Sequence, residues 1–123
     1  MTKHPIVHIE FSAQDREAAA QFYADVFGWK TNQMPEMNYA TFEAEGGPGG
    51  GFNPVSDDFP AGSVVNYVNC DDIQATIAAV KEIGGHVAAD VMEGPGVGQV
   101  AVFLDPSNNL LGLLQPAEEM DQA

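Results

Sequence analysis

The sequence predicts an α+β fold made of two tandem βαβββ modules. A unit of strand, acidic helix start, amphipathic helix and closing glycine occurs near the N-terminus and recurs in register 57 positions later. The two copies comprise residues 7–11, Asp15, Phe22-Tyr23 and Gly28, and residues 64–68, Asp72, 75–83 and Gly85. Strand-like segments follow the helix in both copies. Since a repeat of this kind determines architecture, we expect four strands and one helix per copy.

Length and composition indicate a single globular domain with an acidic surface. We expect one domain over residues 1–123, with module one at about 5–54 and module two at about 63–116. Eighteen acidic against four basic side chains give a net charge of −14. Such a surface repels phosphates and anionic membranes, so the protein is expected to bind neither nucleic acid nor membrane. Without a membrane-length apolar stretch or a signal-peptide pattern, a cytoplasmic location is expected.

The first strand, predicted over residues 6–11, has two different faces. Alternation puts His8 and Glu10 on one face. The opposite, apolar face consists of Val7, Ile9 and Phe11. The following helix is predicted to begin after Asp15 and to end at Gly28, which suit its N-terminal and C-terminal caps. Its apolar stripe comprises Ala19, Phe22, Tyr23, Val26 and Phe27. Packing of this stripe on the apolar strand face would leave His8 and Glu10 facing away from the helix.

Shorter elements complete the two modules. In module one, strands are predicted at 29–33, 39–43 and 51–53, with a flexible glycine-rich turn at 46–51 and an inter-module connection at 54–62. Module two is predicted to contain a strand at 64–70, a helix at 73–83, strands near Val87 and at 99–104 and 110–114, and a turn at 105–109. Its helix stripe comprises Ile73, Thr76, Ile77, Val80 and Ile83. Because Cys70 is the only cysteine, the chain cannot form an internal disulfide. We expect Cys70 to be a small buried hydrophobe.

Short motifs in both halves resemble the vicinal-oxygen-chelate superfamily. The motifs are Phe22-Tyr23, Val26-Phe27-Gly28-Trp29, Asp71-Asp72-Ile73, Gly84-Gly85, Phe103-Leu104-Asp105-Pro106, Asn109 and Gly112-Leu113. That group includes glyoxalases (lactoylglutathione lyases), bleomycin-resistance proteins and extradiol dioxygenases. The resemblance covers about residues 6–115 and implies curled, mixed β-sheets around an open cleft between the modules. It also implies a homodimer.

Metal-dependent members of this superfamily hold a divalent ion with one side chain from each of four strands. His8 stands at the first of these positions, but the equivalent in module two is Val65, and the usual glutamate of the last strand is replaced by Gly112. The fourth position, near Gly51-Phe52, holds no carboxylate either. One imidazole cannot hold a catalytic ion, so we expect no metal cofactor; a nonstandard site using His8, Glu10 and one of Glu43, Asp57 or Asp58 stays open.

The remaining candidate residues point to a small organic ligand. His8, Glu10, Phe52, Tyr67 and Asn69 combine polar groups with apolar surface and are expected to bind it in the cleft. His8 and Glu10 are also the candidate catalytic pair, because a carboxylate can orient or protonate an imidazole. His4 and His86 are expected to face solvent.

The sequence therefore predicts a glyoxalase/bleomycin-resistance-like protein that binds a small molecule without a catalytic metal. Two enzymatic alternatives stay open: a metal-dependent glyoxalase-type lyase or dioxygenase, and a metal-free isomerase or lyase that uses His8 and Glu10. A domain with only a structural or interaction role is a further alternative. Whether the chain is an enzyme is left undecided by the sequence.

Overall fold

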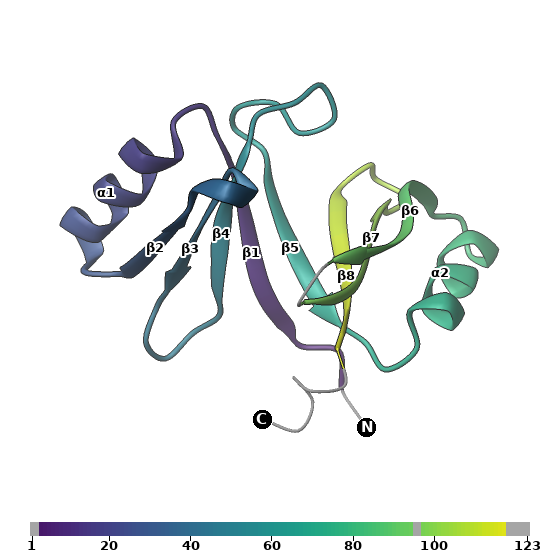
Figure 1. The fold of residues 1–123 in the computed structure, drawn as a ribbon. Helices are drawn as coiled ribbons and strands as arrows, with labels where there is room; N and C mark the ends of the chain where they lie inside the picture. Colours follow the sequence, from purple (N-terminus) through teal and green to yellow (C-terminus); the bar gives the residue numbers. More distant parts are fainter. Residues whose placement is uncertain (1–2, 95–96, 118–123) are drawn as a thin grey trace. The chain divides into compact units, whose positions relative to one another are not determined.

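The computed structural model describes residues 3–94 and 97–117 and confirms an α+β fold of two βαβββ modules (Figure 1). Module one contains β1 (Ile6–Ala13), α1 (Arg16–Phe27), β2 (Lys30–Met34), the 3₁₀ turn η1 (Pro35–Met37), β3 (Tyr39–Glu43) and β4 (Gly49–Pro54). Module two contains β5 (Val64–Asn69), α2 (Ile73–Glu82), β6 (His86–Gly94), β7 (Gly98–Leu104) and β8 (Leu110–Pro116). The predicted connection between the modules has neither helix nor strand at residues 55–63.

The chain forms two compact units. The first unit is Val7–Val65, and the second is Met1–Ile6 together with Asn66–Ala123. In the first, the strand order is β2-β3-β4-β1, with β1 and β4 parallel and the other neighbours antiparallel. In the second, the order is β5-β8-β7-β6, with β5 and β8 parallel and the other neighbours antiparallel. Each unit therefore has one parallel pair at its long connection, as a βαβββ path requires.

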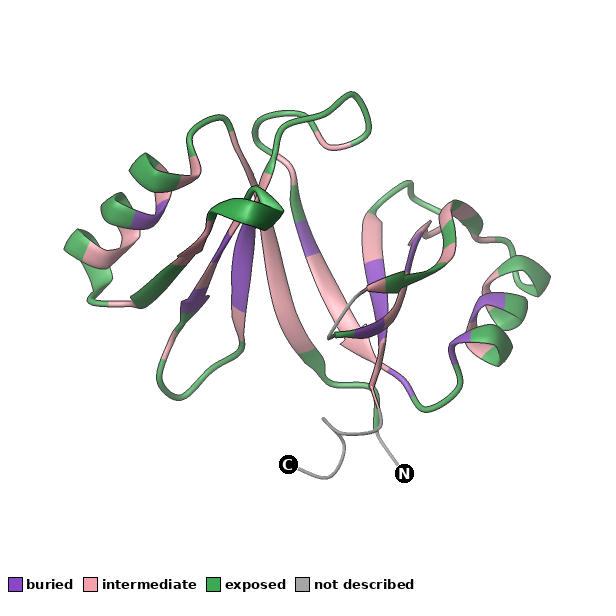
Figure 2. Ribbon diagram, in the orientation of Figure 1, coloured by how far each residue is buried: buried purple, intermediate pink, exposed green. Residues whose placement is uncertain are grey.

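The core of the first unit lies between α1 and the sheet. Its buried members are Ala20, Ala40, Phe42 and Phe52, and Figure 2 shows buried residues on α1, β3 and β4. Ile9 and Phe11 pack against this cluster, which confirms the predicted apolar face of the first strand. Trp29 stacks on Phe42 with ring centroids 4.5 Å apart. The aromatic side chains thus bury the helix-facing side of the sheet and leave the opposite side to His8 and Glu10.

Helix α1 begins and ends as predicted, but its predicted stripe is partly wrong. The Asp15 carboxylate accepts a hydrogen bond from the Ala18 N–H at 3.0 Å, and Gly28 closes the helix with a left-handed φ of 75°. Ala20 is the buried residue of the helix, whereas Phe22 is 59% exposed. Two residues correspond to about 200° around a helix, so Phe22 points away once Ala20 contacts the sheet. Val26 and Phe27 are also exposed.

The predicted flexible glycine turn at 46–51 is wrong for residues 49–51, which belong to strand β4. Gly49, Gly50 and Gly51 belong to the strand, and the last two are buried. A Cβ atom on Gly50 would clash with the Ile9 backbone carbonyl of the neighbouring strand. These glycines are therefore packing residues, because they let β4 approach its neighbours without side chains.

Cys70 is buried in the core of the second unit, as predicted. Cys70 is 1% exposed and packs with Ile73, Ile77, Ala101 and Leu113. The Asp72 carboxylate caps α2 by accepting from the Ala75 N–H at 3.1 Å. Ile83, predicted to belong to the helix stripe, is instead 80% exposed, because it lies beyond the last helical residue.

The turn before β8 is organised by the Asp105 carboxylate. Its Oδ1 accepts hydrogen bonds from the backbone N–H groups of Ser107 at 2.8 Å and Asn109 at 2.9 Å. Asn108 takes a left-handed φ of 67°, which asparagine tolerates. The predicted turn at 105–109 is confirmed. Across residues 3–94 and 97–117, no helix has the length and hydropathy to span a bilayer.

Candidate functional site

The face of the first-unit sheet opposite α1 carries polar side chains in register. Glu10 of β1 pairs with Gly51 of β4, Gly51 pairs with Thr41 of β3, and Thr41 pairs with Asn32 of β2. Paired residues project to the same face of a sheet, so Glu10, Thr41 and Asn32 share this surface. Gly51 lies between them without a side chain. The sheet therefore has a polar face on which Gly51 leaves room for a side chain from a neighbouring strand.

His8 and Glu10 come together on this face, as the alternation predicted. The His8 Nε2 lies 3.6 Å from Glu10 Oε1. The two side chains are 30% and 14% exposed, so the pair reaches the surface but is largely shielded from water. Glu10 Oε2 is buried, and within the described residues no hydrogen-bond partner reaches it. The pair thus combines a reachable imidazole with a carboxylate that has unused acceptor capacity.

Tyr39 joins the pair and was not predicted as a site residue. Its hydroxyl is hydrogen-bonded to His8 Nε2 at 3.1 Å, and which of the two groups donates depends on the histidine tautomer. The ring occupies the space above Gly51, because a Cβ atom there would clash with the Tyr39 phenol. The predicted strand at 39–43 could have indicated the face on which Tyr39 lies. Its contact with His8 depends on the order of the strands, which no local pattern reveals.

The turn that precedes Tyr39 is held by the only arginine of the chain. Arg16 Nη1 donates to Asn38 Oδ1 at 3.0 Å. Asn38 has a left-handed φ of 51° and ends η1 by donating its backbone N–H to the Pro35 carbonyl at 3.0 Å. The first residue of α1 therefore supports the residue that introduces β3 and Tyr39.

The prediction that Phe52 binds the ligand is wrong. It is 0% exposed and lies in the core between α1 and the sheet, with Phe11 and Tyr23 rings stacked on it. Phe52 pairs with Phe11 on β1, one position beyond Glu10 and Gly51. A shift of one residue moves a side chain to the other face of a strand, which is why Phe52 faces the helix.

Tyr67 and Asn69 lie on β5 in the second unit, where Tyr67 repeats the arrangement of Tyr39. Tyr67 pairs with Gly112 of β8, and a Cβ atom on Gly112 would lie 2.5 Å from Cδ2 and Cε2 of the Tyr67 ring. A glycine covered by a tyrosine ring thus occurs in each unit. Asn69 is hydrogen-bonded through its backbone carbonyl to His4 Nδ1 at 3.1 Å. His4 and His86 are exposed, as predicted.

The donor set does not fit the divalent ion of metal-dependent superfamily members. Among the described residues, no group of three or more His, Cys, Asp or Glu side chains could hold an ion. At the expected positions, Val65 is a buried apolar residue, and Gly51 and Gly112 lie under the two tyrosine rings. A glutamate in place of either glycine would require the tyrosine to move.

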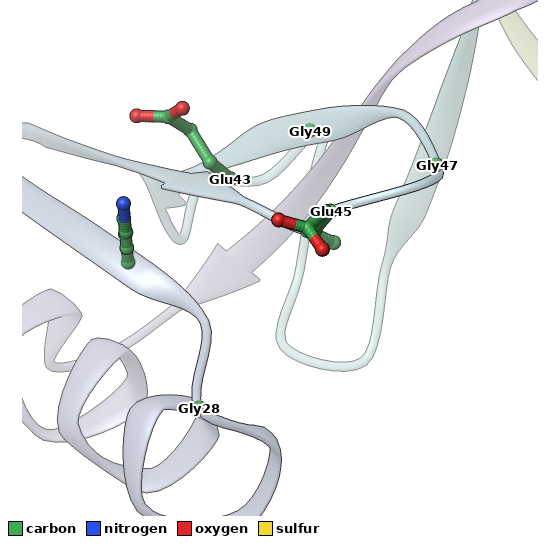
Figure 3. Close-up of a pocket in the computed structure, with 7 residues that line it drawn as sticks. Gly28, Glu43, Glu45, Gly47 and Gly49 are labelled. Carbon is green, nitrogen blue, oxygen red and sulfur yellow. The ribbon is translucent and has the colours of Figure 1, made fainter.

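A shallow depression of about 580 Å³ adjoins the polar face at the turn between β3 and β4 (Figure 3). Its charged lining residues are Lys30, Glu43 and Glu45. Gly49, which pairs with His8, also lines it. Figure 3 shows Glu43 and Glu45 pointing in different directions, so their carboxylates do not converge on one point.

Comparison with known proteins agrees with this fold. Residues 5–44 match the family model described as bleomycin resistance protein-like N-terminal. A glyoxylase-like domain-containing protein of Didymella fabae is 38% identical over 109 residues, which cover 82% of this chain and 85% of that protein. Longer relatives also match: the chain spans 41% of one from Mycobacterium bovis and 42% of one from Streptomyces peucetius.

Solved structures with low sequence identity share the same fold. A glyoxalase/bleomycin resistance protein/dioxygenase superfamily member from Vibrio splendidus 12B01 has a TM-score of 0.67 at 19% identity, covering 92% of this chain and 99% of that one. Methylmalonyl-CoA epimerase from Mycobacterium tuberculosis has a TM-score of 0.71 at 13% identity, covering 100% and 97%. With the relative from Didymella fabae, these matches place the chain in the glyoxalase/bleomycin resistance/dioxygenase superfamily.

Proposed function

We propose that the protein binds a small organic molecule on the polar face of the first unit, without a catalytic metal. His8, Glu10 and Tyr39 are its principal contacts in this proposal, and Tyr67 and Asn69 stay predicted contacts from β5. The observation that carries the proposal is the linked polar cluster: His8 Nε2 is 3.1 Å from the Tyr39 hydroxyl and 3.6 Å from Glu10 Oε1. A few orienting polar groups beside apolar surface are typical of sites for small organic ligands.

The state of the ligand positions supports binding without a metal. One imidazole remains of the four-strand ligand set, and tyrosine rings cover Gly51 and Gly112, where further ligands would be needed. Zinc and related ions need about three protein ligands to be held and oriented. The chain therefore offers hydrogen-bonding groups in place of an ion.

The test combines elemental analysis with ligand binding. The purified full chain, treated with EDTA, is titrated with acetophenone while the His8 and Tyr39 ring signals are followed by NMR. We expect saturable shifts of the His8 and Tyr39 ring signals that are unchanged by EDTA. The Tyr39 shifts should be lost in His8→Ala, and both sets of shifts should be retained in His86→Ala, a matched control at an exposed histidine. Near-stoichiometric zinc, nickel or iron in the purified protein, or binding that requires added metal, would refute the proposal.

A second candidate function is metal-free isomerase or lyase chemistry. It is favoured by the distance of 3.6 Å between His8 and Glu10, which lets the carboxylate orient an imidazole that accepts a substrate proton. The name of one structural neighbour, methylmalonyl-CoA epimerase, suggests a first substrate. We expect exchange of the α-proton of methylmalonyl-CoA with D₂O in the presence of EDTA, reduced by at least about 100-fold in His8→Ala. Exchange no faster than in buffer rules this candidate out.

The homodimer and the cytoplasmic location stay predictions. Light scattering of the purified chain checks the first, since a dimer has twice the 13.1 kDa of the monomer. Phe22 and Val26 are candidate interface residues, because α1 leaves them 59% and 55% exposed.

A further inference from the structure

We infer that the ligand presents an N–H donor, best a protonated amine, to Glu10 Oε2. This inference rests on the proposed function, since it concerns the ligand of the same polar face.

Glu10 Oε2 is a buried acceptor without a donor. The oxygen is shielded from water, and none of the described residues gives it a hydrogen bond. A buried polar group without a partner is unfavourable, and such groups are exceptions that call for an explanation. The side chain as a whole is 14% exposed and His8 beside it is 30% exposed, so the carboxylate lies just below a surface that opens at His8.

His8 cannot supply the missing donor. Its Nε2 is the ring atom near both Tyr39, at 3.1 Å, and Glu10 Oε1, at 3.6 Å. A single N–H at that atom serves those two groups at most, and it lies on the Oε1 side of the carboxylate. Across the sheet, the neighbour in register is Gly51, which has no side chain to offer.

No lysine or arginine neutralises this carboxylate within the described residues. Of the four basic side chains, Arg16 donates to Asn38, and Lys30 lies on β2, the strand farthest from β1 in this unit. Lys3 and Lys81 belong to the second unit. Within the described residues, His8 is the basic group that comes within 4.0 Å of the Glu10 carboxylate. A buried carboxylate without a fixed positive partner favours a ligand that brings one.

Charge selects an amine over other donors. Hydrogen bonds from a charged N–H to a carboxylate are stronger than those from a neutral hydroxyl. The net charge of −14 attracts cations and repels anions at long range. A carboxylate or phosphate ligand, including the methylmalonyl-CoA of the second candidate function, would meet this charge and the Glu10 oxygens. The amine inference therefore belongs to the binding proposal, for which an organic ammonium is the complementary class.

The experiment compares three probes of nearly equal shape. Benzylamine, benzyl alcohol and benzoate are titrated at pH 7.5 into the EDTA-treated full chain, and the signals of the His8 imidazole and of the Glu10 side-chain carboxyl carbon are followed by NMR. We expect benzylamine to bind at least about tenfold tighter than benzyl alcohol, and benzoate to bind weakest. In Glu10→Gln the preference for benzylamine should fall to within about twofold. Glu43→Gln, at an exposed glutamate of the same sheet face, should keep it.

Each other outcome has a distinct meaning. If the three probes bind equally, or benzoate binds best, while His8 still responds, the amine inference is wrong and the proposed function stands. If no probe perturbs His8, both are wrong for this face. If the preference for benzylamine disappears in Glu43→Gln and survives in Glu10→Gln, surface charge explains the preference and the amine inference is wrong. The Glu10 carbon signal in the unaltered protein gives the same answer if Glu10→Gln does not fold.

Discussion

Replacing Gly112 by alanine should destabilise the protein only while Tyr67 is present. The alanine Cβ would lie 2.5 Å from Cδ2 and Cε2 of the Tyr67 ring and 2.8 Å from Cγ. Ordinary carbon contacts are about 3.5–4.0 Å, so the whole ring has to move by about 1 Å. The φ of Gly112 lies outside the left-handed region, so alanine itself fits the backbone.

The magnitude follows from two opposing terms. Forcing one carbon into a packed site costs about 1–3 kcal/mol in the free energy of unfolding. Alanine also restricts the unfolded chain more than glycine does, which stabilises by about 0.4–1 kcal/mol. The net loss in the natural background should be about 1–2 kcal/mol. In Tyr67→Ala the clash is gone, so Gly112→Ala should stabilise by up to about 1 kcal/mol.

Urea unfolding of the four proteins, followed by far-UV circular dichroism, measures this double-mutant cycle. Amide hydrogen exchange at Val102, which pairs with Gly112 across the sheet, reports the same change locally. A coupling energy below about 0.5 kcal/mol would show that the ring does not pack over Gly112. That result would also show that a glutamate could replace Gly112 without moving Tyr67.

Three further predictions concern titration and the turn before Tyr39. Burial is the largest effect on the Cys70 thiol and raises its pKa, the Thr76 hydrogen bond comes second and lowers it, and the Asp71 and Asp72 charges raise it further. Because the folded pKa of Cys70 is raised, the stability that this thiol contributes is complete below the unfolded pKa of about 8.5 and is lost as pH rises through the folded value. DTNB should label the Cys70 thiol only on unfolding. Fast labelling of the native protein would contradict its burial. Hydrogen bonds from the backbone and side chain of Asn109, then from the backbone of Ser107, lower the pKa of the Asp105 carboxyl. The stability that the Asp105 carboxylate contributes is present above the unfolded pKa of about 3.9 and is lost as pH falls through the folded value. The difference in unfolding free energy between the natural protein and Asp105→Ala, measured by urea unfolding at each pH, should therefore shrink below about pH 4. A constant difference would show that the carboxylate charge does not matter. Arg16→Gln should cost about 1 kcal/mol and shift the His8 imidazole signals through Tyr39, whereas Lys81→Gln should not; unchanged His8 signals would show that Arg16 has no role at the site.

Local patterns predicted the helix ends and the two faces of β1. The caps at Asp15, Gly28 and Asp72 depend on the backbone of one turn, and such signals lie within a few neighbouring residues. The alternation that separates His8 and Glu10 from the apolar face of β1 likewise depends only on strand geometry, and the structure keeps it.

Patterns that depend on tertiary contacts were less informative. The run of glycines at 49–51 has the composition of a flexible turn, yet the close approach of neighbouring strands makes it part of β4. Phe22 lies on the expected apolar stripe, yet it is exposed, whereas Ala20, outside that stripe, is buried against the sheet. In both cases the deciding contact comes from residues distant in the sequence.

The sequence by itself determined the α+β class, the two modules, the caps and the pairing of His8 with Glu10 on one face. Only the tertiary structure placed Tyr39 on His8, buried Phe52 beneath α1 and covered Gly51 and Gly112 with tyrosine rings. The physical reason is register: alternation tells which side of its own strand a residue occupies, but the partner across the sheet depends on how strands far apart in the chain align.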